Sequence, residues 1–241
     1  MYSLYTLKRK CTPPEMNKIN KESKLSAFVI IRELESRYGK EKADKLISYL
    51  DMVLERNQFI NLTAIKDRDE ALEKHVLDSL SVTELPEYAE ADRIIDIGTG
   101  AGFPGALLAI VSPEKEFTLM DSTLKRLKVI DEFTSELGIS NAHTVHARAE
   151  EVSRKPDYNA AYDMCVTRAA GNLEKLAGWC LPFIRKGGLL VAYKGENYRE
   201  EIDAAAKAIK KNGGRLNRVV QTDEASGNIS GHVLVLIEKI K

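Results

Sequence analysis

A glycine-rich loop carries the strongest chemical signal in this sequence. The loop, Gly98-Thr99-Gly100-Ala101-Gly102, follows a short β-branched run and precedes residues 106–111, an apolar segment with the character of a helix. Glycine has no Cβ and tolerates positive φ, so a strand, glycine turn and helix in this order let backbone N–H groups come close to a ligand. The arrangement predicts a binding site for a nucleotide-like molecule.

The spacing of the glycines narrows the kind of ligand. A dinucleotide fingerprint places its third glycine one position later, where this chain has Phe103 followed by Pro104. A bulky wall and a rigid first helical turn suit adenosine with a compact amino-acid tail better than a pyrophosphate. With Asp96 opening it, the motif is similar to motif I of S-adenosylmethionine-dependent methyltransferases, and Gly98 and Gly100 become expected cofactor contacts together with Phe103. The alternatives are a tight structural turn or another Rossmann-type ligand.

Two further candidates follow the next predicted strands. Ligands of open parallel sheets bind beyond the carboxyl ends of the strands, and Asp121 ends the segment 117–121, 23 residues beyond Gly98. An acidic side chain roughly 20 residues after the loop is placed to bind ribose hydroxyls. The alternative role for Asp121 is to cap the following helix. After the third strand, the backbone of Ala149 and the side chain of Glu150 could meet an adenine edge or form a solvated turn.

Five basic residues are expected at the same edge of the sheet. Lys125 and Arg126 open a helix, although cations in a first turn oppose the helix dipole at about 0.3–1 kcal/mol each. The other three follow strands: Arg148, Arg168 and Lys194. Each alone would be an ordinary solvated charge. Five at one edge, in a chain whose formal net charge is zero, favour a site for phosphate groups.

The residues around the fourth predicted strand argue against two common reactions. Methylation of an exocyclic amine in nucleic acid usually uses Asn or Asp followed by Pro-Pro and an aromatic residue, whereas this chain has Thr167-Arg168-Ala169-Ala170. Methylation of C5 of a pyrimidine needs a cysteine nucleophile, and Cys165 lies within the strand, where we expect a buried structural thiol. No histidine stands at a strand end as an obvious general base. The site suits an acceptor that needs no deprotonation, such as N7 of guanine, so no catalytic base is expected.

Composition sets the broad class of the protein. The chain has 241 residues, of which 44% are apolar and 30% charged, enough for a substantial core and a soluble surface. Its three cysteines and four histidines form no disulfide or metal-binding pattern, so no metal is expected. No apolar run is long enough to span a membrane and no secretory leader is recognisable, so a cytoplasmic location is expected.

The chain divides into three expected parts. Residues 1–22 lack periodicity and contain Pro13-Pro14, which predicts a poorly ordered tail. Residues 23–90 form a helical segment with apolar stripes, including a helix over 69–85. There, His75 and Asp78 could be a functional pair, although a helix-surface contact is usual for this spacing. Residues 91–241 alternate strand and helix and should form the cofactor-binding domain.

The order of elements in this last part predicts the fold. We expect strands at 94–97, 117–121, 143–147, 163–167, 188–193, 219–222 and 233–237, and helices at 124–137, 172–184 and 198–211. The last two strands have no helix between them and should pair antiparallel. The predicted class is α/β: a Rossmann-like, mostly parallel seven-stranded sheet with a helical N-terminal extension. This topology is similar to that of class I S-adenosylmethionine methyltransferases.

A series of motifs completes the picture. In chain order they are Asn61-Leu62-Thr63-Ala64-Ile65, His75-Val76-Leu77-Asp78-Ser79-Leu80, the glycine loop, Leu119-Met120-Asp121-Ser122, Arg148-Ala149-Glu150, Thr167-Arg168-Ala169 and Tyr193-Lys194-Gly195. Over residues 25–240 the series resembles the RsmG family, also called glucose-inhibited division protein B, of bacterial 16S ribosomal RNA guanine-N7 methyltransferases.

The resemblance implies a reaction and roles for particular residues. It implies methyl transfer from S-adenosylmethionine to N7 of a guanosine in small-subunit RNA. It places cofactor contacts at Gly98, Phe103, Ala149-Glu150 and Arg168. It makes Lys125, Arg126, Arg148 and Lys194 the basic residues that face RNA.

Several alternatives stay open at this point. The substrate can be free 16S RNA or an assembling small-subunit particle, and a monomer is expected as the acting form. A methyltransferase for a small molecule or protein would use the basic edge to bind a carboxylate or phosphate. A nucleotide-binding oxidoreductase, or a binding module without activity, would have the same type of sheet.

Overall fold

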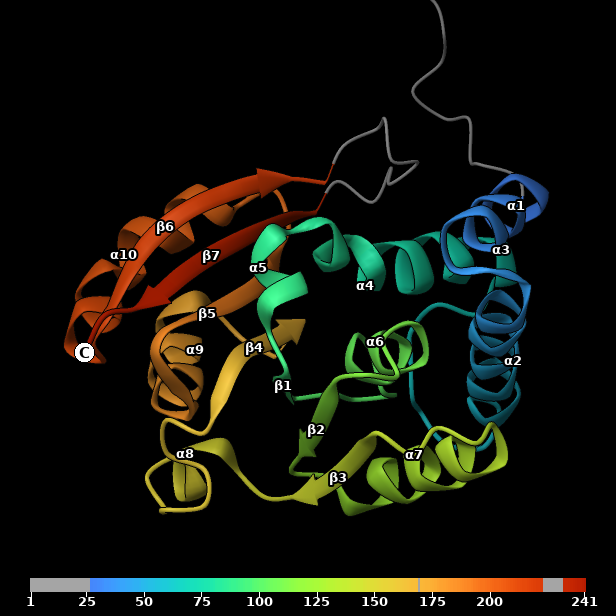
Figure 1. Ribbon diagram of the computed structural model, residues 1–241, viewed down its shortest axis with the longest axis horizontal. Coiled ribbons are helices and arrows are strands. Elements are labelled where there is room, and N and C mark those ends of the chain that lie inside the picture. Colours follow the sequence, from blue (N-terminus) through green and yellow to red (C-terminus); the bar gives the residue numbers. More distant parts are fainter. Residues whose placement is uncertain (1–26, 169, 223–231) are drawn as a thin grey trace, which may run out of the picture.

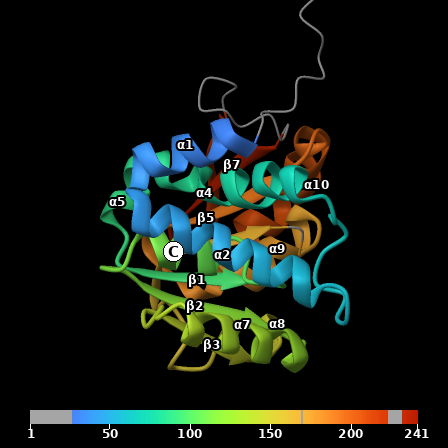
Figure 2. The same cartoon turned by 90° about the vertical axis from the view of Figure 1, so that its right-hand side faces the viewer.

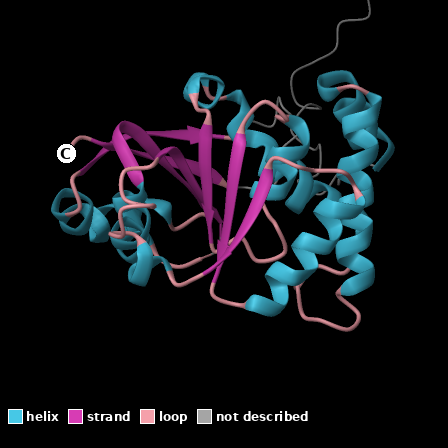
Figure 3. Ribbon diagram, turned by 60° about the horizontal axis from the view of Figure 1, so that its bottom comes forward, coloured by secondary structure: helices cyan, strands magenta, loops and turns pink. Residues whose placement is uncertain are grey.

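A seven-stranded sheet forms the centre of the molecule, with helices on both faces (Figure 3). The computed structural model describes residues 27–168, 170–222 and 232–241. Within them the strand order is β3-β2-β1-β4-β5-β7-β6, with β7 antiparallel to both of its neighbours and the other pairs parallel. This order confirms the predicted fold class and the antiparallel final pair. The strands are β1 (Arg93–Ile97), β2 (Glu116–Asp121), β3 (Ala142–His146), β4 (Tyr162–Arg168), β5 (Ile184–Lys194), β6 (Gly214–Gln221) and β7 (Val233–Lys239).

Successive residues of the central strands supply two separate cores, because side chains alternate between the faces of a sheet. Ile94 packs into a core that includes the N-terminal helices, α6 and α7. Its neighbour Ile95 packs into a second core with α8, α9 and α10. Figure 1 shows these helices around the sheet: α6 (Gly105–Val111), α7 (Leu124–Glu136), α8 (Ala149–Val152), α9 (Leu173–Cys180) and α10 (Tyr198–Lys211).

The N-terminal helices lie across one face of the sheet, in front of the strands in Figure 2. Helices α1 (Ala27–Tyr38) and α2 (Lys40–Arg56) are separated by Gly39, whose positive φ of 82° breaks the helical path. Tyr49 of α2 is fully buried and donates a hydrogen bond to the carbonyl oxygen of Ala101 at 2.9 Å. The N-terminal segment therefore shares a core with the sheet and supports the glycine loop directly.

The single regular helix expected over residues 69–85 is wrong, although the segment is helical. Four short pieces replace it: α3 (Arg68–Ala71), a π-helical stretch (Leu72–Leu77), α4 (Asp78–Leu80) and a 3₁₀ turn (Ser81–Glu84). The short helix α5 (Pro86–Glu90) follows. A π turn changes which side chains share a face. Of the two roles considered for His75 and Asp78, the helix-surface contact is wrong, because Asp78 is fully buried. Both are directed toward the carboxyl edge of the sheet, as described below.

Three other boundaries differ from the expected ones. Strand β5 begins four residues early because Lys186-Gly187-Gly188 continues the strand through a shift of register instead of forming a separate turn. Strand β6 begins at Gly214, directly after the positive-φ Gly213, and is longer than expected. Helix α9 ends at Cys180, before Pro182, which removes a backbone donor.

Two expectations from the sequence concern the N-terminal tail and membrane-spanning helices. The tail predicted at residues 1–22 lies outside the described residues. Among the helices that are described, none is both long and apolar enough to cross a membrane.

Candidate functional site

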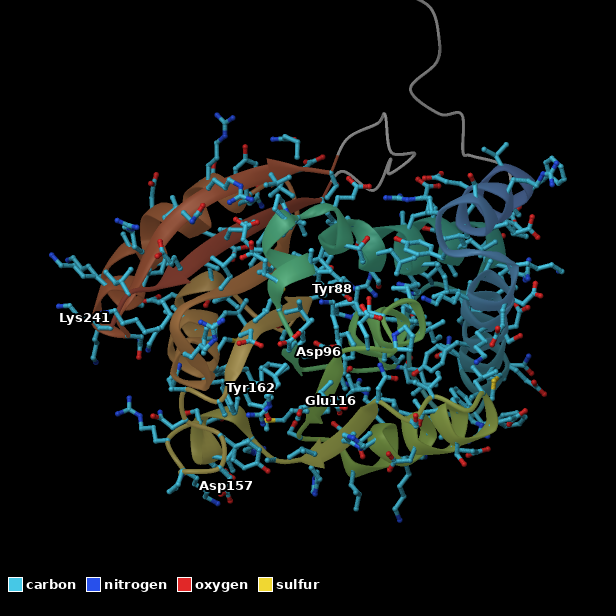
Figure 4. The ribbon with its side chains drawn as sticks, in the orientation of Figure 1. Tyr88, Asp96, Glu116, Asp157, Tyr162 and Lys241 are labelled. Atoms are coloured by element: carbon cyan, nitrogen blue, oxygen red, sulfur yellow. The ribbon has the colours of Figure 1, made fainter. Side chains whose placement is uncertain are left out.

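Asp96 holds the glycine loop from below. It lies in β1 and is fully buried in the middle of the molecule (Figure 4). Its Oδ2 accepts hydrogen bonds from the Thr99 hydroxyl at 2.7 Å and from the Gly105 backbone N–H at 2.9 Å. Burial raises the pKa of Asp96 to about 6, against the lowering effect of these two bonds. The acidic residue that opens the motif therefore shapes the loop.

Two glycines of the loop adopt backbone conformations that favour glycine, and they differ in the space around them. Gly98 and Gly100 have φ of 75° and 61°, a region that other residues rarely adopt. A Cβ at Gly98 would lie 2.8 Å from that of Ala170, while a Cβ at Gly100 would meet nothing closer than a carbonyl oxygen at 3.9 Å. The backbone at Gly100 thus faces open space.

Asp121 connects the loop to the neighbouring strand. Its Oδ2 accepts the Gly100 N–H at 3.0 Å and its Oδ1 accepts the Thr123 N–H at 2.8 Å. The N-cap of α7 is Thr123, so Asp121 does not cap the helix in the expected sense. A carboxylate oxygen accepts more than one hydrogen bond, so both oxygens can accept ligand hydroxyls as well.

Two adjoining cavities open at this edge of the sheet and share Gly98 and Arg126. The smaller one, about 290 Å³, is lined by three of the predicted cofactor residues: Asp121, Ala149 and Glu150. The larger one, about 650 Å³, is lined by three more: Gly100, Phe103 and Arg168. The seventh, Gly98, lines both cavities. The structure thus brings the predicted cofactor residues to two adjoining cavities at one edge of the sheet.

Arg168 is the centre of a buried ionic network beside the larger cavity. Its Nη1 donates to Asp78 Oδ2 at 3.0 Å and to the carbonyl oxygen of Lys74 at 2.8 Å. Asp78 is fully buried and also lies 3.1 Å from His232 Nδ1. Burial raises the pKa of Asp78, but the His232 hydrogen bond and the Arg168 charge outweigh it and hold that pKa below its usual value. The network joins β4 to the N-terminal segment.

His75 extends this network into the cavity wall. Its ring stacks on Phe103, with centroids 4.7 Å apart. The Nδ1 atom lies 3.2 Å from Arg168 Nη2, and Nε2 lies 2.7 Å from Thr63 Oγ1. Burial and the Arg168 charge lower the pKa of His75 to about 4, so its ring is neutral at pH 7.

The sequence analysis did not single out Thr63, and it left His75 and Asp78 either as a functional pair or as a helix-surface contact. Their contacts with Phe103 and Arg168, which lie far along the chain, could not be predicted from local spacing. A buried Asp next to a half-buried His becomes visible only once the π turn directs both toward Arg168.

The basic residues divide into two groups. Lys125 and Arg148 are exposed, and Arg126 is half-buried with Nη1 4.0 Å from Asp121 Oδ2. Lys194 contradicts the expectation of an RNA-facing cation, because it is only 6% exposed. Its ammonium is bound by Glu201 at 2.7 Å and by the Gly171 carbonyl oxygen at 2.6 Å. Burial next to a carboxylate on α10 makes Lys194 part of the cavity wall.

Cys165 is fully buried beside Cys180, as expected for a structural thiol. Burial raises the pKa of Cys165, which opposes formation of a thiolate nucleophile. The described residues contain no group of three or more His, Cys, Asp or Glu side chains that could hold a metal ion.

Comparison with known proteins gives consistent matches. The family model GidB, described as rRNA small subunit methyltransferase G, matches residues 42–230. Ribosomal RNA small subunit methyltransferase G of Clostridium tetani is 40% identical over 204 residues, 85% of each chain. The protein of the same name from Alkaliphilus oremlandii is 41% identical over 198 residues, 82% of each chain.

A solved structure supports the fold independently. A SAM-dependent methyltransferase from Aquifex aeolicus has a TM-score of 0.52 and 17% identity, covering 71% of this chain and 93% of that chain. With the matches in sequence, the resemblance inferred from the motifs is confirmed: the chain belongs to the GidB family of rRNA small subunit methyltransferase G.

Proposed function

We propose that this chain transfers a methyl group from S-adenosylmethionine to N7 of a guanosine in small-subunit ribosomal RNA. The observation that carries the proposal is the pair of adjoining cavities that share Gly98 and Arg126, with a carboxylate in one and a neutral aromatic wall in the other. The family to which the chain belongs supports the same reaction.

The cofactor residues suit the two ends of S-adenosylmethionine. Asp121 would accept hydrogen bonds from the ribose hydroxyls, and Ala149 and Glu150 would border the adenine in the smaller cavity. Gly98 and Gly100 would lie against the middle of the S-adenosylmethionine molecule, since open space faces the Gly100 backbone. When bound, the cofactor supplies an electrophilic methyl group on a sulfonium. Phe103 and Arg168 line the larger cavity toward which that group would point.

The larger cavity suits an acceptor with a free lone pair. Its described titratable side chains already have partners: Glu201 pairs with Lys194, and the His75 Nδ1 faces Arg168. N7 of guanine has an in-plane lone pair at neutral pH, so positioning it in line with the methyl group is the main requirement. The chain's own contribution is therefore to orient the base and exclude water.

The substrate RNA would approach over the start of α7. Arg126 lines both cavities, Arg148 is exposed and lines the smaller one, and Lys125 is exposed on α7 next to Arg126 in the chain. These three would contact phosphates, whose attraction to cations supplies most sequence-independent affinity. We place the reaction in the cytoplasm, with a monomer acting on 16S RNA or on a small-subunit particle.

Transfer of a tritiated methyl group tests this proposal. Small-subunit particles from cells that lack the activity are incubated with labelled S-adenosylmethionine and the purified chain. Label in the 16S RNA, and none in RNA of particles from cells that have the activity, is expected. Label only in ribosomal proteins, or in small molecules of the extract, would contradict the proposed substrate.

A further inference from the structure

Thr63 is held rigidly at the wall of the larger cavity. It belongs to the loop between α2 and α3, and the Asn57 side chain fixes that loop with three hydrogen bonds. Asn57 Oδ1 accepts the N–H groups of Leu62 at 2.8 Å and of Thr63 at 3.0 Å. Asn57 Nδ2 donates to the Thr63 carbonyl oxygen at 2.9 Å. The Thr63 side chain is thus presented to the cavity by a fixed backbone.

The hydrogen bonds around His75 fix the position of its proton. Arg168 is always protonated and has only donors, so its Nη2 donates to His75 Nδ1 at 3.2 Å. The neutral His75 ring carries one proton, which must therefore be on Nε2. Nε2–H then donates to Thr63 Oγ1 at 2.7 Å.

Thr63 Oγ1 accepts a second hydrogen bond, from the Ile65 backbone N–H at 3.2 Å. A hydroxyl oxygen has two acceptor sites and one O–H donor. Both acceptor sites are used, one by His75 and one by Ile65. The hydroxyl proton remains, and Thr63 faces the cavity as an obligate hydrogen-bond donor.

Such a donor distinguishes the two purines. On the edge that carries N7, guanine presents the O6 acceptor, whereas adenine presents the N6 amine donor. A fixed donor can donate to O6 of guanine. Opposite the N6 amine of adenine it would face a second donor and make no hydrogen bond. We propose that Thr63 determines base specificity by donating its hydroxyl proton to O6 of the target guanine. The inference rests on the proposed function and adds a residue to it.

Replacing the target base tests the role of O6. Reconstituted small-subunit particles carry guanine, hypoxanthine or 2-aminopurine at the methylated nucleotide, and kcat/KM for methyl transfer is measured. Hypoxanthine keeps O6, and 2-aminopurine lacks it but keeps N7. We expect the wild-type chain to lose about tenfold with 2-aminopurine, the scale of one net hydrogen bond, and less than threefold with hypoxanthine.

Thr63→Val and Thr63→Ser separate recognition from structural support. Valine has nearly the same shape without a hydroxyl, so we expect about tenfold lower kcat/KM on guanine and a guanine to 2-aminopurine ratio near one. Serine retains the hydroxyl and should retain the wild-type ratio. The electronic effect of removing O6 is the same in both enzymes and cancels in this comparison. Binding of S-adenosylhomocysteine by each variant checks that the cofactor site is intact.

The possible outcomes are distinct. Thr63→Val with an unchanged guanine to 2-aminopurine ratio would overturn the role of Thr63 and leave the proposed function standing. A guanine to 2-aminopurine ratio near one for the wild-type chain would also overturn the role of Thr63 and leave the proposed function standing. This outcome does not depend on whether the valine variant folds. Failure of the wild-type chain to methylate the guanine particle would overturn the proposed function, and this inference with it.

Discussion

Asp121 joins the glycine loop to the proposed ribose site through one carboxylate. Replacing it with alanine removes the acceptors of the Gly100 and Thr123 N–H groups, and with them the proposed acceptors of the ribose hydroxyls. We expect Asp121→Ala to weaken binding of S-adenosylhomocysteine at least about tenfold, the scale of one or more lost hydrogen bonds. Isothermal titration calorimetry measures this directly.

Asp157 offers a matched control for that experiment. It is exposed in the loop after α8, at the outer edge of the molecule (Figure 4). Asp157→Ala should bind S-adenosylhomocysteine as the wild-type chain does. Equal affinity of Asp121→Ala and Asp157→Ala would remove Asp121 from the cofactor site.

His75 makes stability depend on pH in a definite direction. Its pKa is about 4 in the folded chain against 6.5 for the free side chain, because of burial and the Arg168 charge. Asp78, a backbone hydrogen bond at Lys74 and Glu70 act in the other direction. Between these values the unfolded chain binds a proton that the folded chain does not. The contribution of His75 to stability is therefore lost as pH falls from 6.5 toward 4.

The variant His75→Gln cannot titrate, so it should lose less stability on acidification. We expect it to be less stable than the wild-type chain at pH 7, with a gap that narrows by roughly 2 kcal/mol at pH 5. Urea unfolding at the two pH values measures the gap. The matched variant His143→Gln, at an exposed position, should show little change. A gap for His75→Gln that is the same at both pH values would contradict a neutral, buried His75.

At this scale the sequence predicts residues whose role follows from local position. Gly98 and Gly100 adopt positive φ, and Asp121 stands at a strand end, so motif spacing suffices to find them. Lys194 also stands at a strand end, but Glu201 on the following helix binds its ammonium. Nothing in the local sequence reveals that pairing.

At the scale of elements, the Arg168–Asp78 ion pair fastens α4 to β4. Removing one partner of a buried pair leaves the other charge without compensation. We expect Asp78→Ala to lower the free energy of unfolding by about 3 kcal/mol, measured by urea denaturation. Asp44→Ala, which breaks an exposed pair with Lys40 within α2, should cost less than about 0.5 kcal/mol. Similar losses in the two variants would show that the network does not join these elements.

Helix α7 presents Lys125 at its positive end. A glutamate there favours the helix dipole by about 0.3–1 kcal/mol, so Lys125→Glu should not destabilise the fold. If Lys125 contacts a phosphate, the variant should raise KM for the RNA substrate several-fold and reduce the salt dependence of binding by about one unit of slope. Its affinity for S-adenosylhomocysteine should not change.

Lys207→Glu supplies the control, since Lys207 is exposed on α10, over the opposite face of the sheet. The change in net charge is the same for both variants. Unchanged KM for RNA with Lys125→Glu, or an equal rise with Lys207→Glu, would show that the start of α7 is ordinary surface.

The elements themselves follow the sequence where periodicity is strong. Helix α10 matches the expected residues 198–211, and Gly138 ends α7 with a φ of 65°, as its sequence indicates. The division of residues 68–84 into short helical pieces could not be predicted from the sequence. The spacing of apolar residues is similar for α, π and 3₁₀ turns over such short stretches. This region packs against α1, α2 and α6, and the choice among the three kinds of turn depends on that packing.

For the whole molecule, alternation of strand and helix was enough to predict a parallel sheet with helices on both faces. The insertion of β7 between β5 and β6 could not be read from the chain, since it depends on which strand edge remains free. The formal net charge of zero describes the whole chain and not one surface, and Arg126 and Arg148 line the cavities.

Identification of the methylated nucleoside tests the central claim most directly. The 16S RNA of particles treated with the chain and S-adenosylmethionine is digested to nucleosides and fragments and analysed by mass spectrometry. The account predicts one new methyl group, on N7 of a single guanosine. A methyl group on an exocyclic amine, a ring carbon or a ribose oxygen would contradict it.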